Sequence, residues 1–159
     1  MTFFLDLDGV LADFDLGYEN LTGIKPTRWP HPDNINWNRI QAVPDFYLSL
    51  PLMPGAEMLF EATAALCERY GGQPTILTGI PASIDAADNN KRRWVARHFG
   101  ENVPVICCRS RDKYLHGKPN DVLVDDYLKY RREWEHMGGV FIHYRDAAQA
   151  IDELTMLAT

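Results

Sequence analysis

Short apolar runs alternate with helix-like stretches along this chain, and that alternation constrains the fold more than any other feature. We expect strands at the apolar runs, which are Phe3 to Leu5, Thr75 to Thr78, Val103 to Cys107, Val122 to Val124 and Val140 to Ile142. Helical patterns lie between these runs at 54–70, 83–99 and 127–137, and after the last run at 147–157. When strand and helix alternate, the helices connect parallel strands. The sequence therefore predicts an α/β fold, doubly wound and Rossmann-like, with a mainly parallel sheet.

Local signals mark the ends of two predicted helices. Pro54-Gly55 begins the first, and Gly71-Gly72 ends it, because glycine readily adopts the left-handed conformation of a helix stop. Ser83 is the predicted N-cap of the second, since its hydroxyl could accept a hydrogen bond from the first turn. Gly100 follows the expected end of that helix at Phe99.

The segment 14–50 interrupts this rhythm. It is rich in aromatic residues and prolines, which are Trp29, Trp37, Phe46, Tyr47, Pro26, Pro30, Pro32 and Pro44. Such a composition suits short helices and ordered loops better than a flexible linker. We predict a small helical cap insert over the active site, within a single domain of residues 1–159, because this length suits one sizeable core.

Charge and cysteine content narrow the classes of partner. The formal net charge of -6 argues against a nucleic-acid polymer or an anionic membrane as partner. Cys67, Cys107 and Cys108 are odd in number and lack zinc-ligand spacing, so we expect reduced thiols. The chain shows no apolar run of membrane-spanning length, and too little sequence precedes Asp6 for a signal peptide. We expect a cytoplasmic protein in a reducing environment. Whether it forms a homodimer stays open.

Carboxylates follow two of the predicted strands. Asp6 and Asp8 come directly after the first, and Gly9 leaves room for a phosphate and a cation beside them. Asp125 and Asp126 follow Val122 to Val124. Ligands bind beyond the carboxyl ends of parallel strands, and adjacent carboxylates repel unless a cation shares them. The pattern indicates a divalent-metal site; the structural alternative is a capped turn for Asp6 and Asp8 and a helix N-cap for Asp125 and Asp126.

A hydroxyl and a lysine complete the set. Thr78 ends a predicted strand, where its hydroxyl could donate to a phosphoryl oxygen or serve only as a structural cap. Lys113 and Lys118 both precede the second acidic pair, and either could neutralise a phosphate. For each lysine a solvated surface charge is the alternative.

Along the chain the four features are the Asp6–Asp8 pair, Thr78, the lysine and the Asp125–Asp126 pair. In this order they resemble the four motifs of the haloacid dehalogenase (HAD) superfamily. The stretch DLDGVLADF from Asp6 to Phe14 is similar to its 5'(3')-deoxyribonucleotidase family in particular. Phe46-Tyr47 ahead of Pro54-Gly55-Ala56, and Arg109 to Lys113, resemble the same family, so the likeness covers nearly the whole chain. Two departures stand out. Gly79 replaces the family's usual Ser, which removes one potential phosphate donor, and more residues separate Lys113 from Asp125 than in the family.

The resemblance implies a Mg²⁺-dependent phosphoric monoester hydrolase that acts on deoxyribonucleoside monophosphates. It implies that Asp6 is the nucleophile and forms an aspartyl phosphate, while Asp8 is the general acid and base. The resemblance also implies that Thr78 and Lys113, which is preferred to Lys118, stabilise the phosphate, and that Phe46, Tyr47 and Gly79 belong to the substrate pocket. It implies that Mg²⁺ is bound by Asp6, the Asp8 main-chain carbonyl and Asp126, while Asp125 holds a metal-bound water.

Two alternatives stay open. One is a phosphatase of the same superfamily that acts on another small phosphomonoester. The other is a phosphoacceptor or binding module without turnover, against which Asp8 argues, since a mere acceptor needs no second catalytic carboxylate. The sequence does not decide the base, the 5' or 3' position of the phosphate, or deoxyribose against ribose.

Overall fold

A computed structural model describes residues 1–27 and 34–159, so Trp29, Pro30 and Pro32 of the predicted insert lie outside the described residues. Five strands form one sheet, and every pair of neighbours in it is parallel. The strands are β1 Phe3–Leu5, β2 Thr75–Gly79, β3 Val105–Cys108, β4 Val122–Asp125 and β5 Val140–His143. Their order is β3-β2-β1-β4-β5, which confirms the predicted doubly wound α/β fold.

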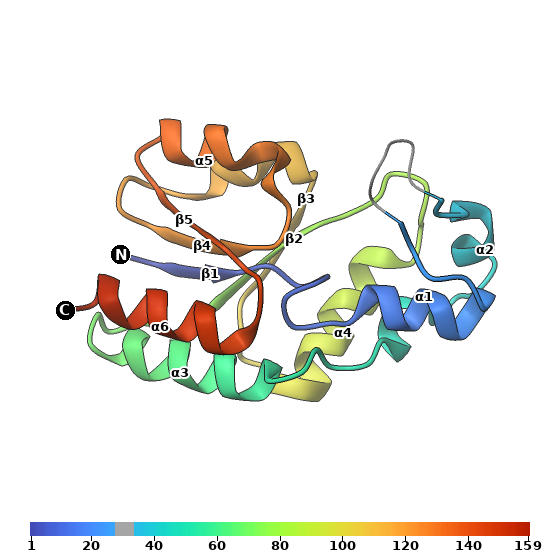
Figure 1. Cartoon of the computed structure of the whole chain (residues 1–159), viewed down its shortest axis with the longest axis horizontal. Coiled ribbons are helices and arrows are strands. Elements are labelled where there is room, and N and C mark those ends of the chain that lie inside the picture. Colours follow the sequence, from blue (N-terminus) through green and yellow to red (C-terminus); the bar gives the residue numbers. More distant parts are fainter. Residues whose placement is uncertain (28–33) are drawn as a thin grey trace.

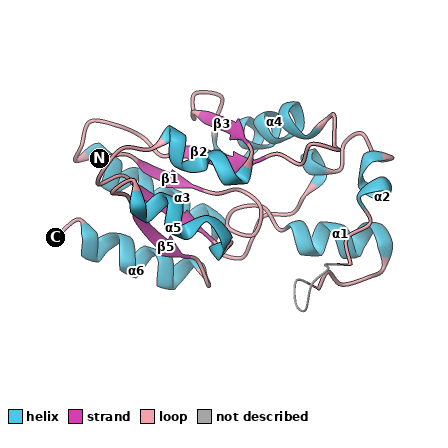
Figure 2. Cartoon of the chain, turned by 90° about the horizontal axis from the view of Figure 1, so that it is seen from above, coloured by secondary structure: helices cyan, strands magenta, loops and turns pink. Residues whose placement is uncertain are grey.

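Helices cover both faces of the sheet (Figure 1). The α-helices are α1 Phe14–Thr22, α2 Trp37–Gln41, α3 Ala56–Glu68, α4 Ala87–Phe99, α5 Arg131–His136 and α6 Ala147–Leu157. Short 3-10 helices are η1 Tyr47–Ser49, η2 Ser110–His116 and η3 Leu128–Tyr130. Helices α3 and α6 lie side by side on one face, and α5 lies on the other (Figures 1 and 2). Among the described residues, none of the helices has the length and apolar character needed to span a bilayer.

Two hydrophobic cores form because successive side chains of a strand point to opposite faces. Phe3 and Leu5 of β1 join the larger core, which also contains Trp94 of α4. Phe4, between them, joins a smaller core beneath α5, where it packs edge-on against Trp134 at a centroid distance of 5.6 Å. The strands that are buried on both faces are mostly apolar, as expected of a parallel sheet. This burial explains why short apolar runs could be read as strands.

Most predicted element boundaries agree with the structure within two residues, and two elements differ by more. The predicted cap Ser83 is wrong: α4 begins at Ala87, with Ala86 as its N-cap. The chain turns before this helix instead, since the amide of Ile84 donates to the carbonyl of Pro81 and the amide of Asp85 donates to Gln41 Oε1. The expected helix at 127–137 is divided into η3 and α5.

Helices α1 and α2 and the 3-10 helix η1 lie beyond the carboxyl ends of the strands, apart from the sheet (Figure 1). Helix α4 holds this region in place. Trp94 Nε1 donates to the carbonyl of Leu50 at 2.8 Å, and Asn90 Nδ2 donates to the carbonyl of Pro44 at 2.6 Å. The described part of segment 14–50 therefore lies beside the strand ends, where a ligand of the sheet would lie, and its role as a cap stays a prediction.

Candidate active site

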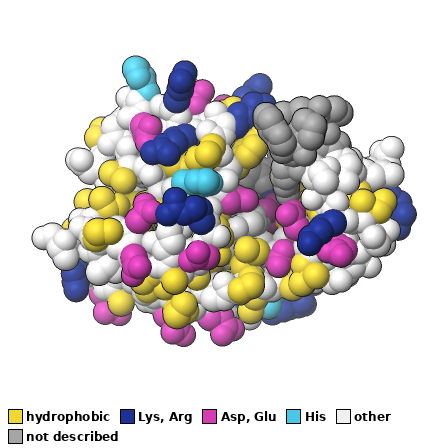
Figure 3. Space-filling view, in the orientation of Figure 1, with side chains coloured by type: hydrophobic (Ala, Val, Ile, Leu, Met, Phe, Trp, Pro, Cys, Tyr) yellow, Lys and Arg dark blue, Asp and Glu magenta, His cyan; other side chains and the backbone are white. Residues whose placement is uncertain are grey.

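The carboxyl ends of three neighbouring strands bring the predicted site residues together. Asp6 follows β1, which is the central strand of the three. Thr78 lies near the end of β2 and Asp125 ends β4, and these two strands are the neighbours of β1 in the sheet. The three residues border a cavity of about 590 Å³, a volume within the usual range for small-molecule sites. Its wall also includes Asp8, Phe14, Trp37, Tyr47, Gly79, Ser110, Lys113 and Asp126. Acidic side chains gather between the sheet region and the α1–α2 region (Figure 3).

The loop after β1 is a tight turn that holds both aspartates. The carbonyl of Leu7 accepts hydrogen bonds from three amides, those of Val10, Leu11 and Ala12. Gly9 has φ +83, a left-handed conformation that favours glycine, and the carboxylate of Asp126 occupies the space that a β-carbon would need. Gly9 therefore allows the second acidic pair to approach the first.

Lys113 connects the two acidic pairs. Its ammonium lies 2.8 Å from Asp6 Oδ1 and 2.7 Å from Asp125 Oδ2, and the side chain is buried. Burial opposes the charged form of Lys113, but the carboxylates of Asp6 and Asp125 outweigh this effect and raise its pKa above the ordinary lysine value. Lys118, the rival in the sequence, is exposed, and its backbone amide donates to Asp121. The geometry favours Lys113 as the cation of the site.

The acidic cluster crowds negative charge around the buried carboxyl group of Asp125. Burial and then the charge of Asp6 raise the pKa of Asp125 to about 7, although Lys113 acts in the opposite direction. Oxygen atoms of Asp6, Asp125 and Asp126 all lie within 4.8 Å of one another. Closely spaced carboxylate oxygens are the ligands that Mg²⁺ prefers, and a divalent cation would stabilise their charged forms. These residues therefore fit a divalent-metal site.

In the metal-free protein, we expect the free energy of unfolding to decrease as the pH rises from about 5 to 7, with Asp125 as the cause. Its folded pKa of about 7 exceeds the ordinary value of 3.8, so across this window the native state holds a proton that the unfolded chain has lost. The contribution of this group is at most about 1.4 kcal/mol per pH unit.

Urea unfolding in EDTA, on the wild type and Asp125→Asn, measures this effect. The stability of the wild type should decrease more steeply over the window than that of the variant. Added Mg²⁺ should stabilise the wild type more at pH 7.5 than at pH 5.5, because protons compete with the cation for the same oxygens. Equal slopes for the two proteins in EDTA would contradict the assignment to Asp125.

Lys91 is a site residue that the sequence did not reveal. Its side chain is 1% exposed and its ammonium donates three hydrogen bonds, to Asp8 Oδ2 at 2.8 Å, to Thr78 Oγ1 at 3.1 Å and to the carbonyl of Gly79 at 2.7 Å. It also lies 4.8 Å from the centre of the Tyr47 ring. In the sequence it belongs to a polar run, Asn90 to Arg93, that is typical of a solvated helix face.

One signal could have identified Lys91. It lies four residues after Ala87 and three before Trp94, so it shares their face of α4, and that face is buried. A lysine at an apolar position of a helix requires a buried partner, since an unpaired buried charge is costly.

Lys91 fixes how Asp8 and Thr78 present their polar atoms. An ammonium can only donate, so Thr78 Oγ1 accepts from it and keeps its own proton for another acceptor. Lys91 holds Asp8 Oδ2. Among the described residues, Asp8 Oδ1 is the one buried side-chain nitrogen or oxygen atom without a hydrogen-bond partner. Buried polar atoms are normally paired, so an unpaired carboxylate oxygen at a cavity indicates a ligand or a proton-transfer role.

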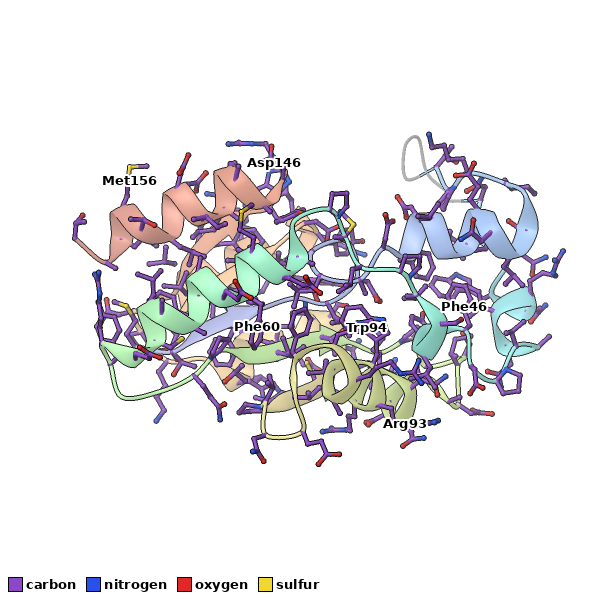
Figure 4. The ribbon with its side chains drawn as sticks, turned by 90° about the horizontal axis from the view of Figure 1, so that it is seen from below. Phe46, Phe60, Arg93, Trp94, Asp146 and Met156 are labelled. Carbon is purple, nitrogen blue, oxygen red and sulfur yellow. The ribbon has the colours of Figure 1, made fainter. Side chains whose placement is uncertain are left out.

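Aromatic rings form the wall of the cavity on the insert side, but Phe46 is not among them. Phe14, Trp37 and Tyr47 line the cavity in the described structure. Phe46 is 4% exposed and packs behind Tyr47, at a centroid distance of 5.2 Å, in the region of η1 (Figure 4). Phe46 is therefore one ring removed from the cavity wall, and its contact with a substrate stays a prediction.

Two known proteins with similar sequences carry the same enzyme name. No family model matches the chain. A Bordetella pertussis protein, named provisionally as a 5'(3')-deoxyribonucleotidase, is 27% identical over 158 residues, which cover 86% of this chain and 82% of that protein. A human protein named "5'(3')-deoxyribonucleotidase, cytosolic type" is 25% identical over 169 residues, with 89% and 80% covered.

Among solved structures, a HAD family hydrolase from Deinococcus radiodurans R1, with bound phosphate and sodium, matches with a TM-score of 0.48 and 14% identity. The match covers 96% of this chain and 87% of the other. The motifs and the names of the two relatives agree, and the chain is thus similar to the 5'(3')-deoxyribonucleotidases.

Proposed function

We propose that this protein is a Mg²⁺-dependent 5'(3')-deoxyribonucleotidase that hydrolyses deoxyribonucleoside monophosphates through an aspartyl phosphate on Asp6. One observation carries the proposal: Lys113 bridges the carboxylates of Asp6 and Asp125, while Asp8 stands beside them with one oxygen unpaired. This supplies a nucleophile, a phosphate-neutralising cation and a proton-transfer group at one edge of the sheet. The names of the two relatives support the same reaction.

In the first step, a carboxylate oxygen of Asp6 attacks phosphorus and the bond from phosphorus to the ribose oxygen breaks. Asp8 gives its proton to that leaving oxygen. In the second step, Asp8 takes a proton from water as the water attacks phosphorus, and the bond to Asp6 breaks to release phosphate. Because Lys91 holds Asp8 Oδ2, the unpaired Oδ1 is the oxygen that carries the proton in both steps.

Positive charge and hydrogen-bond donors must stabilise the phosphoryl group as it transfers. Lys113 neutralises the nucleophile and the phosphate, and the Thr78 hydroxyl, whose proton is not used by Lys91, donates to a phosphoryl oxygen. Asp6, Asp126 and the Asp8 main-chain carbonyl would hold Mg²⁺, with Asp125 supporting the site. When bound, Mg²⁺ would offset the negative charge that otherwise repels a carboxylate from a phosphate dianion.

The aromatic wall supports a nucleotide substrate over a phosphomonoester without a base. Phe14, Trp37 and Tyr47, which come from the insert, line the same cavity as the charged residues of the strand ends. Stacking a base on an aromatic ring contributes about 1–3 kcal/mol in single-strand binding. We also propose a cytoplasmic location for this protein. The name of the human relative, which is a cytosolic type, supports that location.

Trp37→Ala tests the substrate class. Trp37 is only half-buried, so its removal should leave the fold intact, and it should raise KM for a deoxyribonucleoside monophosphate about tenfold through lost stacking. para-Nitrophenyl phosphate, which has no base, should be nearly unaffected. Tyr70→Ala is the matched control, since Tyr70 is an exposed ring outside the cavity wall. An equal loss on both substrates would point to a phosphatase for another small phosphomonoester.

A further inference from the structure

Position 79 departs from the family that the motifs resemble, and the structure shows what takes its place. Gly79 has an ordinary negative-φ backbone, so the backbone does not require glycine there. The available space does require glycine, because a β-carbon at position 79 would overlap the hydroxyl oxygen of Ser110. The volume of the missing side chain is thus filled by a hydroxyl that comes from another part of the chain.

Ser110 is held in this position by the end of the sheet. Gly79 pairs with Cys108 in the register of β2 and β3, and the amide of Ile80 donates to the carbonyl of Cys108 at 2.8 Å. Ser110 follows two residues later as the first residue of η2. The carbonyl of Gly79 accepts from Lys91, so the strand side of this contact is fixed as well.

The side chain of Ser110 faces the charged centre of the site. Residues three apart in a 3-10 helix lie one above the other, and Lys113 is three residues after Ser110 in η2. Lys113 reaches Asp6, and Ser110, Gly79 and Thr78 border the same cavity. Within the described part of the chain, the Ser110 hydroxyl has no protein hydrogen-bond partner, so its proton is available to a ligand.

We propose that Ser110 is a phosphate-binding residue that supplies the hydroxyl missing at position 79. Its O–H donates to a non-bridging oxygen of the substrate phosphate, beside the donors Lys113 and Thr78. The inference rests on the proposed function for the identity of the ligand, and adds a residue to the phosphate subsite. It also explains Gly79: a larger residue there would push the Ser110 hydroxyl out of the site.

Ser110→Ala tests the inference with inorganic phosphate as the probe. In calorimetric titrations with Mg²⁺ present, the variant should bind phosphate about tenfold more weakly, because one hydrogen bond to a charged acceptor is lost. KM should rise by a similar factor for para-nitrophenyl phosphate and for nucleotides, since both carry the phosphate. Ser83→Ala, which changes an exposed serine outside the cavity wall, should bind phosphate like the wild type.

The double variant Gly79→Ser/Ser110→Ala separates phosphate binding from packing. It returns a hydroxyl to the same space from the strand side, and a β-carbon at 79 would lie 3.2 Å from the β-carbon of residue 110, which requires only a small shift. We expect it to recover most of the phosphate affinity that Ser110→Ala loses. If Ser110 served packing alone, Gly79→Ala/Ser110→Ala, which fills the same space without a hydroxyl, would recover as much affinity, and that result would overturn the inference.

Failure of this inference and failure of the proposed function have different results. If the wild-type protein turns over phosphomonoesters and Ser110→Ala binds phosphate as tightly as the wild type, the role of Ser110 is overturned and the hydrolase is left intact. Absence of wild-type turnover on every phosphomonoester removes the hydrolase, yet weaker phosphate binding by the variant still supports Ser110 as a phosphate-binding residue. A wild type that binds no phosphate contradicts both.

Discussion

Asp6→Asn should lower phosphate release by several orders of magnitude, because an amide is a poor nucleophile and the change also removes a carboxylate that could bind a metal. The fold should persist, since Asn fills the same space and can still accept a hydrogen bond from Lys113. The measurement is steady-state phosphate release with Mg²⁺, with circular dichroism to establish that the variant is folded.

Asp88→Asn is the matched control for this substitution. Asp88 is exposed and pairs with Arg92 on the surface of α4, and such pairs contribute little. Its activity should stay within about twofold of the wild type, as expected for a surface change. Retention of more than about a tenth of wild-type turnover by Asp6→Asn would remove Asp6 from the role of nucleophile, since loss of a nucleophile costs far more.

Lys91→Met is the second change with a large expected effect. It deletes the buried ammonium that holds Asp8 Oδ2 and Thr78 Oγ1, while methionine keeps most of the side-chain volume. We expect kcat to fall by about two orders of magnitude, the low end of the usual contribution of general acid–base catalysis. KM should change little, because Lys91 positions Asp8 and Thr78 and is not proposed to contact the substrate. Arg93→Met, an exposed change on the same helix, should be neutral.

A double-mutant cycle distinguishes positioning from general destabilisation. If Lys91 acts through Asp8, then adding Lys91→Met to an Asp8→Asn protein should cost little further kcat, since residues that work as a unit are not additive. Asp8→Asn alone should slow both chemical steps and still permit Mg²⁺ binding, because the ligand expected from that residue is its main-chain carbonyl. Full additivity of the two losses would contradict the positioning role.

The strands and most of the charged site could be predicted from the sequence because they depend on local pattern. Apolar runs identified the buried strands, and the carboxyl-end rule brought Asp6, Thr78 and Asp125 to one edge of the sheet. The motif favours Lys113 over Lys118, and in the structure the Lys113 ammonium lies between Asp6 and Asp125.

What escaped prediction depends on tertiary contacts. Lys91 looks like part of a solvated basic run until α4 is packed against the sheet, and Phe46 and Tyr47 are adjacent in the sequence yet only Tyr47 lines the cavity. The partnership of Gly79 with Ser110 joins residues from two strand ends, so no local pattern reveals it. Ser83 has the chemistry of an N-cap, but the turn that ends at Asp85 delays the helix to Ala87.

The most direct test of the proposed function is phosphate release by the purified protein from a panel of deoxyribonucleoside and ribonucleoside monophosphates, phosphorylated at either the 5' or the 3' position. Each substrate is assayed with Mg²⁺ and with EDTA, and para-nitrophenyl phosphate serves as the reference without a base. The account predicts Mg²⁺-dependent turnover, with kcat/KM for at least one deoxyribonucleoside monophosphate about tenfold or more above the reference, as base stacking implies. Equal turnover in EDTA, or no preference for any nucleotide over the reference, would contradict it.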